Sequence, residues 1–139
     1  MKPPSETHVV IAGAGLVGAL LACQLGKRGY RVTLCERRPD PRAAGFIGGR
    51  HDEKSNLTFQ AYSSNPEDAI RSISRSDLNL ILLDAADKNT NVDIRFESRC
   101  ISADLDAPSI ELETPTGRVT IAGDFVIGCD GAFSAVRGA

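Results

Sequence analysis

The sequence predicts an α/β fold in which a parallel sheet is followed by a three-stranded antiparallel meander. The first observation behind this prediction is a strand, a glycine turn, a helix and a second strand within residues 8–36. Such a unit joins two parallel strands through a crossover helix. The second observation is a series of short strand-like segments after Asn91, separated by proline and glycine. The 139 residues fit one domain.

In the first unit, His8–Ala12 is apolar after its first residue and is expected to be a buried strand. The helix that follows is expected to end at Gly29, because glycine readily adopts the conformation that terminates a helix. Arg31–Glu36 is the second predicted strand. Arg37–Arg50 is rich in proline, glycine and arginine and is expected to be a loop, and Leu57–Tyr62 alternates in a way compatible with a strand.

The second half of the chain begins with a predicted helix over Ser76–Ala86, which places Leu78, Ile81, Leu82 and Ala85 on one face. Ser76 is its expected N-cap, since a serine oxygen can accept from a free N–H of the first turn. Two parallel strands are expected to enclose the meander. The predicted strands are Val92–Phe96, Cys100–Leu105, Ser109–Thr114, Arg118–Ile121 and Phe125–Gly128.

Composition excludes several classes of function. The net charge is −2, aromatic residues make up 5% of the chain and tryptophan is absent, so no nucleic-acid partner is expected. The apolar run Val9–Cys23 is shorter than the ~20 residues that span a bilayer, so no membrane segment is expected. The four cysteines and two histidines lack zinc-ligand spacing. Free thiols in a reducing compartment are expected, which indicates a cytoplasmic protein.

The glycine turn carries the clearest functional signal, because Gly13–Gly18 matches G-x-G-x-x-G between a predicted strand and a predicted helix. Gly13 permits the tight turn, Gly15 lets the backbone approach a pyrophosphate, and Gly18 lets the helix pack on the strand. The free N–H groups at the helix start favour phosphate. The residues expected to contact a dinucleotide here are Gly13, Gly15, Leu16, Val17 and Gly18. A structural glycine turn without a ligand is the alternative.

Glu36, at the end of the second predicted strand, is expected to accept hydrogen bonds from the adenosine ribose hydroxyls. Its charge would repel a 2′-phosphate, so this site is expected to reject NADP. The alternative is a solvated strand end. Arg37 and Arg38 either contact the adenosine half or lie on a solvated loop face. The turn and Glu36 together do not choose between NAD and FAD.

A second motif bears on that choice. The stretch Val126–Arg137 resembles the Asp-Gly fingerprint of flavoprotein aromatic hydroxylases, in which an apolar strand leads to Asp-Gly and then to serine and arginine at fixed spacing. Asp130, Gly131, Ser134 and Arg137 match it. The resemblance implies FAD as the cofactor. Together with the strand order it implies a Rossmann-like FAD-binding domain of the glutathione-reductase type.

A closer resemblance is to the kynurenine 3-monooxygenase family. It rests on Glu36–Arg42, on Ser72–Asn79 with the leucines that follow, and on Ile127–Ala132. In that family the arginine at the place of Arg75 contacts the flavin cofactor, so the resemblance implies the same here. A surface cation at a helix start is the alternative. The family also implies NADPH as the reductant and a kynurenine-like aromatic substrate in tryptophan catabolism.

The chain departs from that family in two places. After Arg50 the family continues into a segment beside the flavin, so an internal deletion near residues 50–56 is expected. The family's later Gly-Asp motif is absent before Ala139. Residues 1–139 are therefore expected to form a truncated FAD-binding domain that does not hydroxylate kynurenine alone, and no catalytic residue is identified. The alternatives are a non-catalytic remnant and an NAD-dependent dehydrogenase domain.

Overall fold

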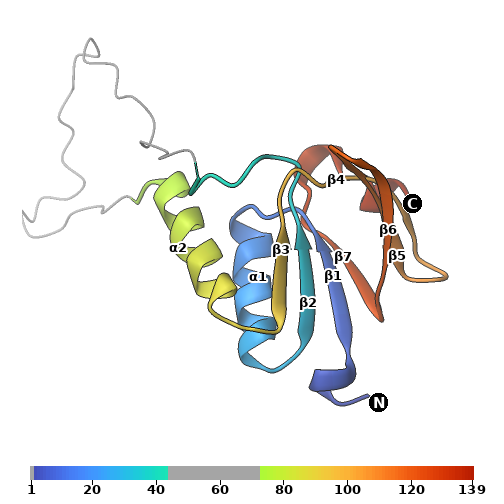
Figure 1. Cartoon of the computed structure of the whole chain (residues 1–139), viewed down its shortest axis with the longest axis horizontal. Helices are drawn as coiled ribbons and strands as arrows, with labels where there is room; N and C mark the ends of the chain where they lie inside the picture. Colours follow the sequence, from blue (N-terminus) through green and yellow to red (C-terminus); the bar gives the residue numbers. More distant parts are fainter. Residues whose placement is uncertain (1, 44–72) are drawn as a thin grey trace, which may run out of the picture.

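The computed structural model describes residues 2–43 and 73–139. A four-stranded parallel sheet forms its centre, with two α-helices on one face and a three-stranded antiparallel sheet on the other (Figure 1). The strand order is β3-β2-β1-β7, so the first strand of the chain lies between the second and the last. The strands are β1 (His8–Ala12), β2 (Arg31–Cys35), β3 (Val92–Arg95) and β7 (Phe125–Gly128). The predicted parallel sheet is confirmed.

Helix α1 (Leu16–Lys27) connects β1 to β2, and Gly29 follows its end with a φ of +84°, as the sequence predicts for a terminating glycine. Helix α2 (Arg75–Asp87) precedes β3. The prediction of Ser76 as its N-cap is wrong. Ser74 is the cap, and its side chain accepts a hydrogen bond from the Asp77 N–H at 3.3 Å. Ser74 lies three residues before that amide, whereas Ser76 already lies within the first turn.

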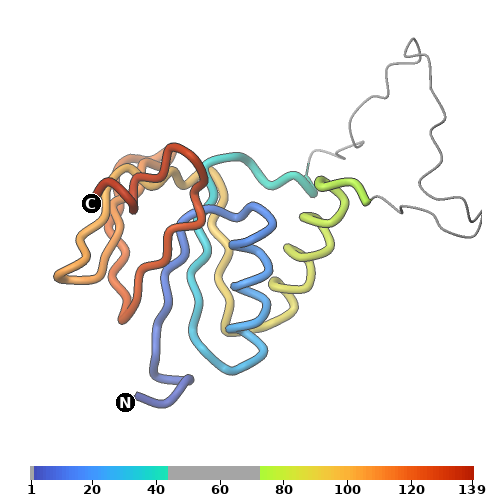
Figure 2. The backbone as a smooth tube through the Cα atoms, turned by 180° about the vertical axis from the view of Figure 1, so that it is seen from behind, coloured from blue at the N-terminus to red at the C-terminus, as the bar shows by residue number. Residues whose placement is uncertain are grey.

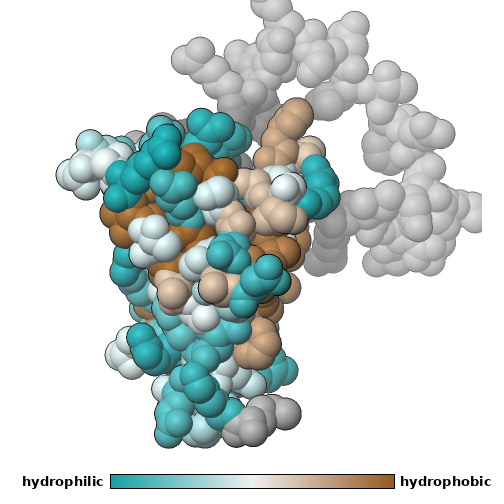
Figure 3. All heavy atoms as spheres, turned by 90° about the vertical axis from the view of Figure 1, so that its right-hand side faces the viewer, coloured by the Kyte–Doolittle hydropathy of each residue, from teal (hydrophilic) through white to brown (hydrophobic). Residues whose placement is uncertain are grey.

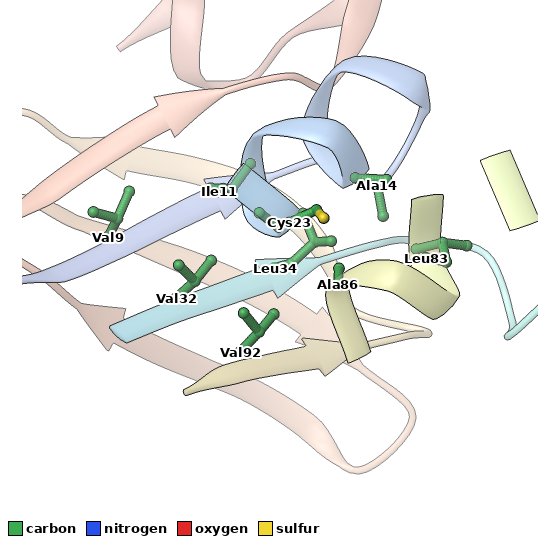
Figure 4. Close-up of a cluster of buried hydrophobic side chains, with 11 residues drawn as sticks. Val9, Ile11, Ala14, Cys23, Val32, Leu34, Leu83, Ala86 and Val92 are labelled. Atoms are coloured by element: carbon green, nitrogen blue, oxygen red, sulfur yellow. The ribbon is translucent and has the colours of Figure 1, made fainter. Parts of the chain in front are cut away.

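The main core lies between the helices and the sheet (Figure 4). Alternate residues of the central strands, such as Ile11 and Leu34, point toward the helices and are fully buried. Small residues such as Ala19 and Ala22 on the inner face of α1 allow the helix to approach them closely. The remaining alternate residues point to the opposite face of the sheet, where a second apolar cluster includes Val10.

The antiparallel sheet covers that opposite face and confirms the predicted meander, with the order β4-β5-β6. Its strands are β4 (Arg99–Asp104), β5 (Ser109–Thr114) and β6 (Gly117–Ala122). Ile110 and Leu112 of β5 are fully buried against Val10 and Cys35 of the parallel sheet. Figure 3 shows the molecule from the side of the antiparallel sheet, where apolar patches lie on a largely polar surface. One face of this sheet packs on the core and the other faces solvent, as is common for antiparallel sheets.

Short 3₁₀ turns complete the described structure: η1 (Pro4–Glu6), η2 (Gly131–Phe133) and η3 (Val136–Gly138). The predicted strand Leu57–Tyr62 and the second half of the predicted loop Arg37–Arg50 lie outside the described residues. Among residues 2–43 and 73–139, no helix is both long and apolar enough to cross a bilayer.

Candidate functional site

Three motifs that are far apart in the sequence meet at the carboxyl edge of the parallel sheet. Gly13 follows β1, Glu36 follows β2, and Asp130 follows β7. Figure 2 shows the turn after β1 and the chain after β7 at the same end of the sheet. Together with Arg37 and Gly131 they line a cleft of about 690 Å³ between the parallel sheet and the meander. Ligands of open α/β sheets bind at this kind of edge.

Two glycines of the turn are required by the fold itself. Gly13 has a φ of +100°, and a Cβ on it would overlap the carbonyl of Cys129 at the end of β7. A Cβ on Gly18 would overlap the carbonyl oxygen of Gly13. The Gly13 N–H donates to the Cys35 carbonyl at 2.7 Å. The turn therefore packs closely between the ends of β2 and β7, and the first turn of α1 packs closely against it.

Gly15 differs from both of these glycines. Its φ of −69° suits any residue, and a Cβ on it would meet no atom within 4 Å in the described part of the chain. It is the N-cap of α1 and offers no side chain to cap it; the hydrogen bond from the Ala19 N–H to the Gly15 carbonyl measures 2.9 Å. The N–H groups of Leu16 and Val17 therefore lack an acceptor inside the helix. This is the arrangement that binds anions.

Glu36 is buried and firmly held. Its Oε2 accepts from the Ala14 N–H at 3.0 Å, and its Oε1 accepts from the Arg38 N–H at 3.0 Å and from Arg38 Nε at 2.9 Å. Burial disfavours the charged form, but the hydrogen bonds from Arg38 and Ala14 outweigh it and hold the pKa of Glu36 below its ordinary value. The side chain is thus anionic at neutral pH, and its oxygens retain further lone pairs for a ligand.

Helix α2 brings a second set of polar groups to the turn. Arg75 and Asn79 lie one turn apart on the same helix face and line a depression of about 410 Å³ with Gly15, Leu16 and Val17. Asn79 Nδ2 donates to the Ala14 carbonyl oxygen at 3.0 Å. Sequence reasoning assigned Arg75 a role through the family resemblance but gave none to Asn79. Its position four residues after Arg75, one helical turn away, is the sequence signal that could have indicated a role for Asn79.

The Asp-Gly motif forms a compact turn after β7. Asp130 Oδ2 accepts from the Ala135 N–H at 2.8 Å, while its Oδ1 is buried without a hydrogen-bond partner in the described part of the chain. Burial opposes ionisation, but hydrogen bonds from Ser134 and from backbone N–H groups hold the pKa of Asp130 below its ordinary value. Gly131 has a φ of +80°, and Arg137 donates to the Ala132 carbonyl at 2.5 Å. The serine and arginine of the motif therefore shape this turn.

The cleft contains features that sequence reasoning did not assign to a site. Arg37 and Arg38 both line it, and Arg38 also forms an ion pair with Glu36, which the sequence did not predict. Three free cysteines, Cys35, Cys100 and Cys129, also line it. Burial raises the pKa of the Cys35 thiol to about 12 and raises those of the other two, so these thiols are protonated and poorly nucleophilic at neutral pH.

Comparison of the sequence with known proteins identifies relatives. Residues 8–101 match the family model described as FAD dependent oxidoreductase. Kynurenine 3-monooxygenase of Anopheles gambiae is 32% identical over 93% of this chain and 34% of its own length. The enzyme of Dictyostelium discoideum is 35% identical over 94% and 35%, and that of Myxococcus xanthus 31% identical over 99% and 38%. The chain thus spans about a third of these relatives, and the predicted resemblance is confirmed.

Solved structures share the fold. A ternary complex of aklavinone-11 hydroxylase with FAD and aklavinone matches 96% of this chain and 34% of its own length, with a TM-score of 0.71 and 24% identity. BexE, described as acting in oxidation during BE-7585A biosynthesis, matches with a TM-score of 0.70 and 24% identity. At this identity the match establishes the α/β architecture alone, with its parallel and antiparallel sheets.

Proposed function

Because the chain belongs to the family of FAD-dependent oxidoreductases, we propose that it binds FAD in the cleft at the carboxyl edge of the parallel sheet. The observation that carries the proposal is Gly15, a glycine that neither its backbone conformation nor the packing among residues 2–43 and 73–139 requires. It lies at the start of α1 and lines the cleft, so the absence of a side chain leaves room for a ligand. The family match favours FAD over the NAD left open by the turn alone.

The residues present fit the parts of FAD. The N–H groups at the start of α1 would bind the pyrophosphate, and Glu36 would accept from the adenosine ribose. Arg75 and Arg37 would add positive charge at the phosphates and at the adenosine half. Asp130 and Gly131 would lie beside the remainder of the cofactor, where the buried Asp130 Oδ1 has an unused acceptor. When bound, FAD supplies the redox chemistry.

For the whole protein we propose an NADPH-dependent aromatic hydroxylase that acts on kynurenine or a similar compound in the cytoplasm. The names of the curated relatives support this, and the two-sheet architecture is compatible with an FAD domain of the glutathione-reductase type. Glu36 is anionic and would repel a 2′-phosphate, so this cleft suits FAD and NADPH would bind elsewhere.

A second candidate is a non-catalytic relative that retains only dinucleotide binding. One observation favours it. The alignment with the Myxococcus xanthus enzyme runs over 174 residues, more than the 139 of this chain, so that enzyme has residues without a counterpart here. This is compatible with an internal deletion, which we propose lies near residues 50–56. NADPH oxidation stimulated by kynurenine, with 3-hydroxykynurenine as product, would refute the second candidate.

The test of FAD binding is calorimetric titration of the chain with FAD and with ADP. Gly15→Val should weaken both by more than tenfold, because valine tolerates the backbone at residue 15 but its side chain enters the space of the phosphates. Gly138→Val is the matched control, since a Cβ on Gly138 also meets no atom within 4 Å but lies outside the cleft lining. Unchanged ADP affinity in folded Gly15→Val would refute the proposed site.

A further inference from the structure

We propose that Asn79 is a positioning residue for the dinucleotide turn: it binds the Ala14 carbonyl oxygen, so that the turn presents N–H groups and not a carbonyl to the phosphates. This inference rests on the proposed function and adds to it a residue on α2, 65 positions away from the turn in the sequence.

The Ala14 residue is held from two sides. Its N–H donates to Glu36 Oε2 at 3.0 Å, and its carbonyl oxygen accepts from Asn79 Nδ2 at 3.0 Å. Ala14 is only 2% exposed. Each of its neighbours is a glycine, and glycine allows the backbone the widest range of conformations. Two side chains from different elements therefore set the orientation of peptide groups that the glycines alone leave free.

This orientation matters for electrostatics. A carbonyl oxygen carries a partial negative charge, so a free Ala14 carbonyl near a pyrophosphate would oppose binding. By donating a hydrogen bond, the Asn79 amide offsets the partial negative charge of that oxygen, and it adds no net charge of its own. Arg75 lies one turn earlier on the same helix face and supplies positive charge at the start of α1. The face of α2 at the turn thus combines a cation with a neutral donor.

Packing does not explain Asn79. Helix α2 is anchored to the core by Leu83 and Ala86, which are 1% and 0% exposed. Farther along the helix, Asp84 and Asp87 form ion pairs with Arg42 at 3.2 and 3.0 Å. Asn79 is only partly buried at the turn end of the helix. Removing its amide should leave the helix in place and release the Ala14 carbonyl.

The experiment measures ADP and adenosine affinity of the full chain by calorimetry, with thermal unfolding of each variant. Asn79→Ala should weaken ADP binding roughly five- to tenfold, the usual effect of one hydrogen bond, and should change adenosine binding less than twofold. Asn89→Ala is the matched control. The Asn89 amide also donates to a backbone carbonyl, that of Ala85 at 2.9 Å. Asn89 lies just after the C-terminal end of α2, at the opposite end of the helix from the turn. This variant should keep the ADP affinity of the unsubstituted chain.

Asn79→Asp provides a readout that a purely structural role would not change. At pH 8 its carboxylate would repel both the Ala14 carbonyl and the phosphates, so ADP should bind more weakly than to Asn79→Ala. As the pH falls toward 4, near the ordinary aspartate pKa of about 3.9, a growing fraction of the carboxyl groups is protonated and can donate as the amide does. The ADP affinity of Asn79→Asp relative to Asn79→Ala should therefore rise severalfold as the pH falls. The ratio cancels the protonation of ADP itself.

The outcomes separate the two claims. If the unsubstituted chain binds neither ADP nor FAD, the proposed function fails and this inference fails with it. If the unsubstituted chain binds ADP and folded Asn79→Ala binds it equally well, only the role of Asn79 is refuted. Equal losses for ADP and adenosine, or a pH-independent ratio between the Asp and Ala variants, would also refute it.

Discussion

Replacing Glu36 by glutamine tests how the carboxylate joins the ends of β1 and β2. Glu36 accepts from the Ala14 N–H and from two donors of Arg38, at 2.9–3.0 Å. Glutamine retains one acceptor oxygen and must turn its NH₂ group toward an N–H donor on the other side. A buried hydrogen bond to a charged group contributes about 1.5–3 kcal/mol. We therefore expect Glu36→Gln to lower the free energy of unfolding by about 2–3 kcal/mol.

The assay is urea and thermal unfolding, followed by circular dichroism. A loss of this size should lower the midpoint temperature by roughly 5–15 °C for a chain of this length. Glu97→Gln is the matched control. The Glu97 side chain is exposed, and the Glu97 backbone N–H donates to the Arg38 carbonyl at 3.0 Å. It should change the unfolding free energy by less than about 0.5 kcal/mol.

The dependence on pH gives the sign of the effect. The folded-state pKa of Glu36 lies below its ordinary value, so its contribution is present above the unfolded-state pKa of about 4.3 and is lost as the pH falls through the folded value. The difference between the unsubstituted chain and Glu36→Gln should therefore be largest near pH 7 and shrink below pH 4. A Glu36→Gln variant as stable as the unsubstituted chain at pH 7, or a difference that grows in acid, would refute this reasoning.

Two further predictions concern the framework of the site. Gly18→Ala should prevent native folding, because its methyl group would overlap the Gly13 carbonyl oxygen; a native circular dichroism spectrum and an unchanged unfolding midpoint would contradict this. Arg42→Ala should cost about 1–2 kcal/mol, since Arg42 pairs with three aspartates and lies 5.7 Å from the centre of the Phe96 ring. Its cost in urea unfolding should be smaller in 1 M salt, and a salt-independent cost would show that the ion pairs do not carry it.

The sequence predicted most helices and strands within one or two residues. Apolar periodicity and the positions of glycine and proline are local properties, and they mark where the chain changes direction. The N-cap of α2 was missed, since Ser74 and Ser76 both precede an apolar run and only the hydrogen bond to Asp77 distinguishes them. Leu57–Tyr62 lies outside the described residues, so that predicted strand remains a prediction.

The sequence by itself determined the α/β class, the glycine turn Gly13–Gly18 and the acidic residue after β2, because each follows from neighbouring residues whose spacing matches one geometry. Only the tertiary structure decided which of these groups meet and what each one binds. Asn79 reaches Ala14 across 65 residues, and of the two arginines that line the cleft, Arg37 and Arg38, it is Arg38 that pairs with Glu36. The three glycines look alike in the sequence, but Gly13 and Gly18 are required by packing and Gly15 is not. Contacts between distant segments depend on how helices and strands pack, and the spacing of residues along the chain does not encode that packing locally.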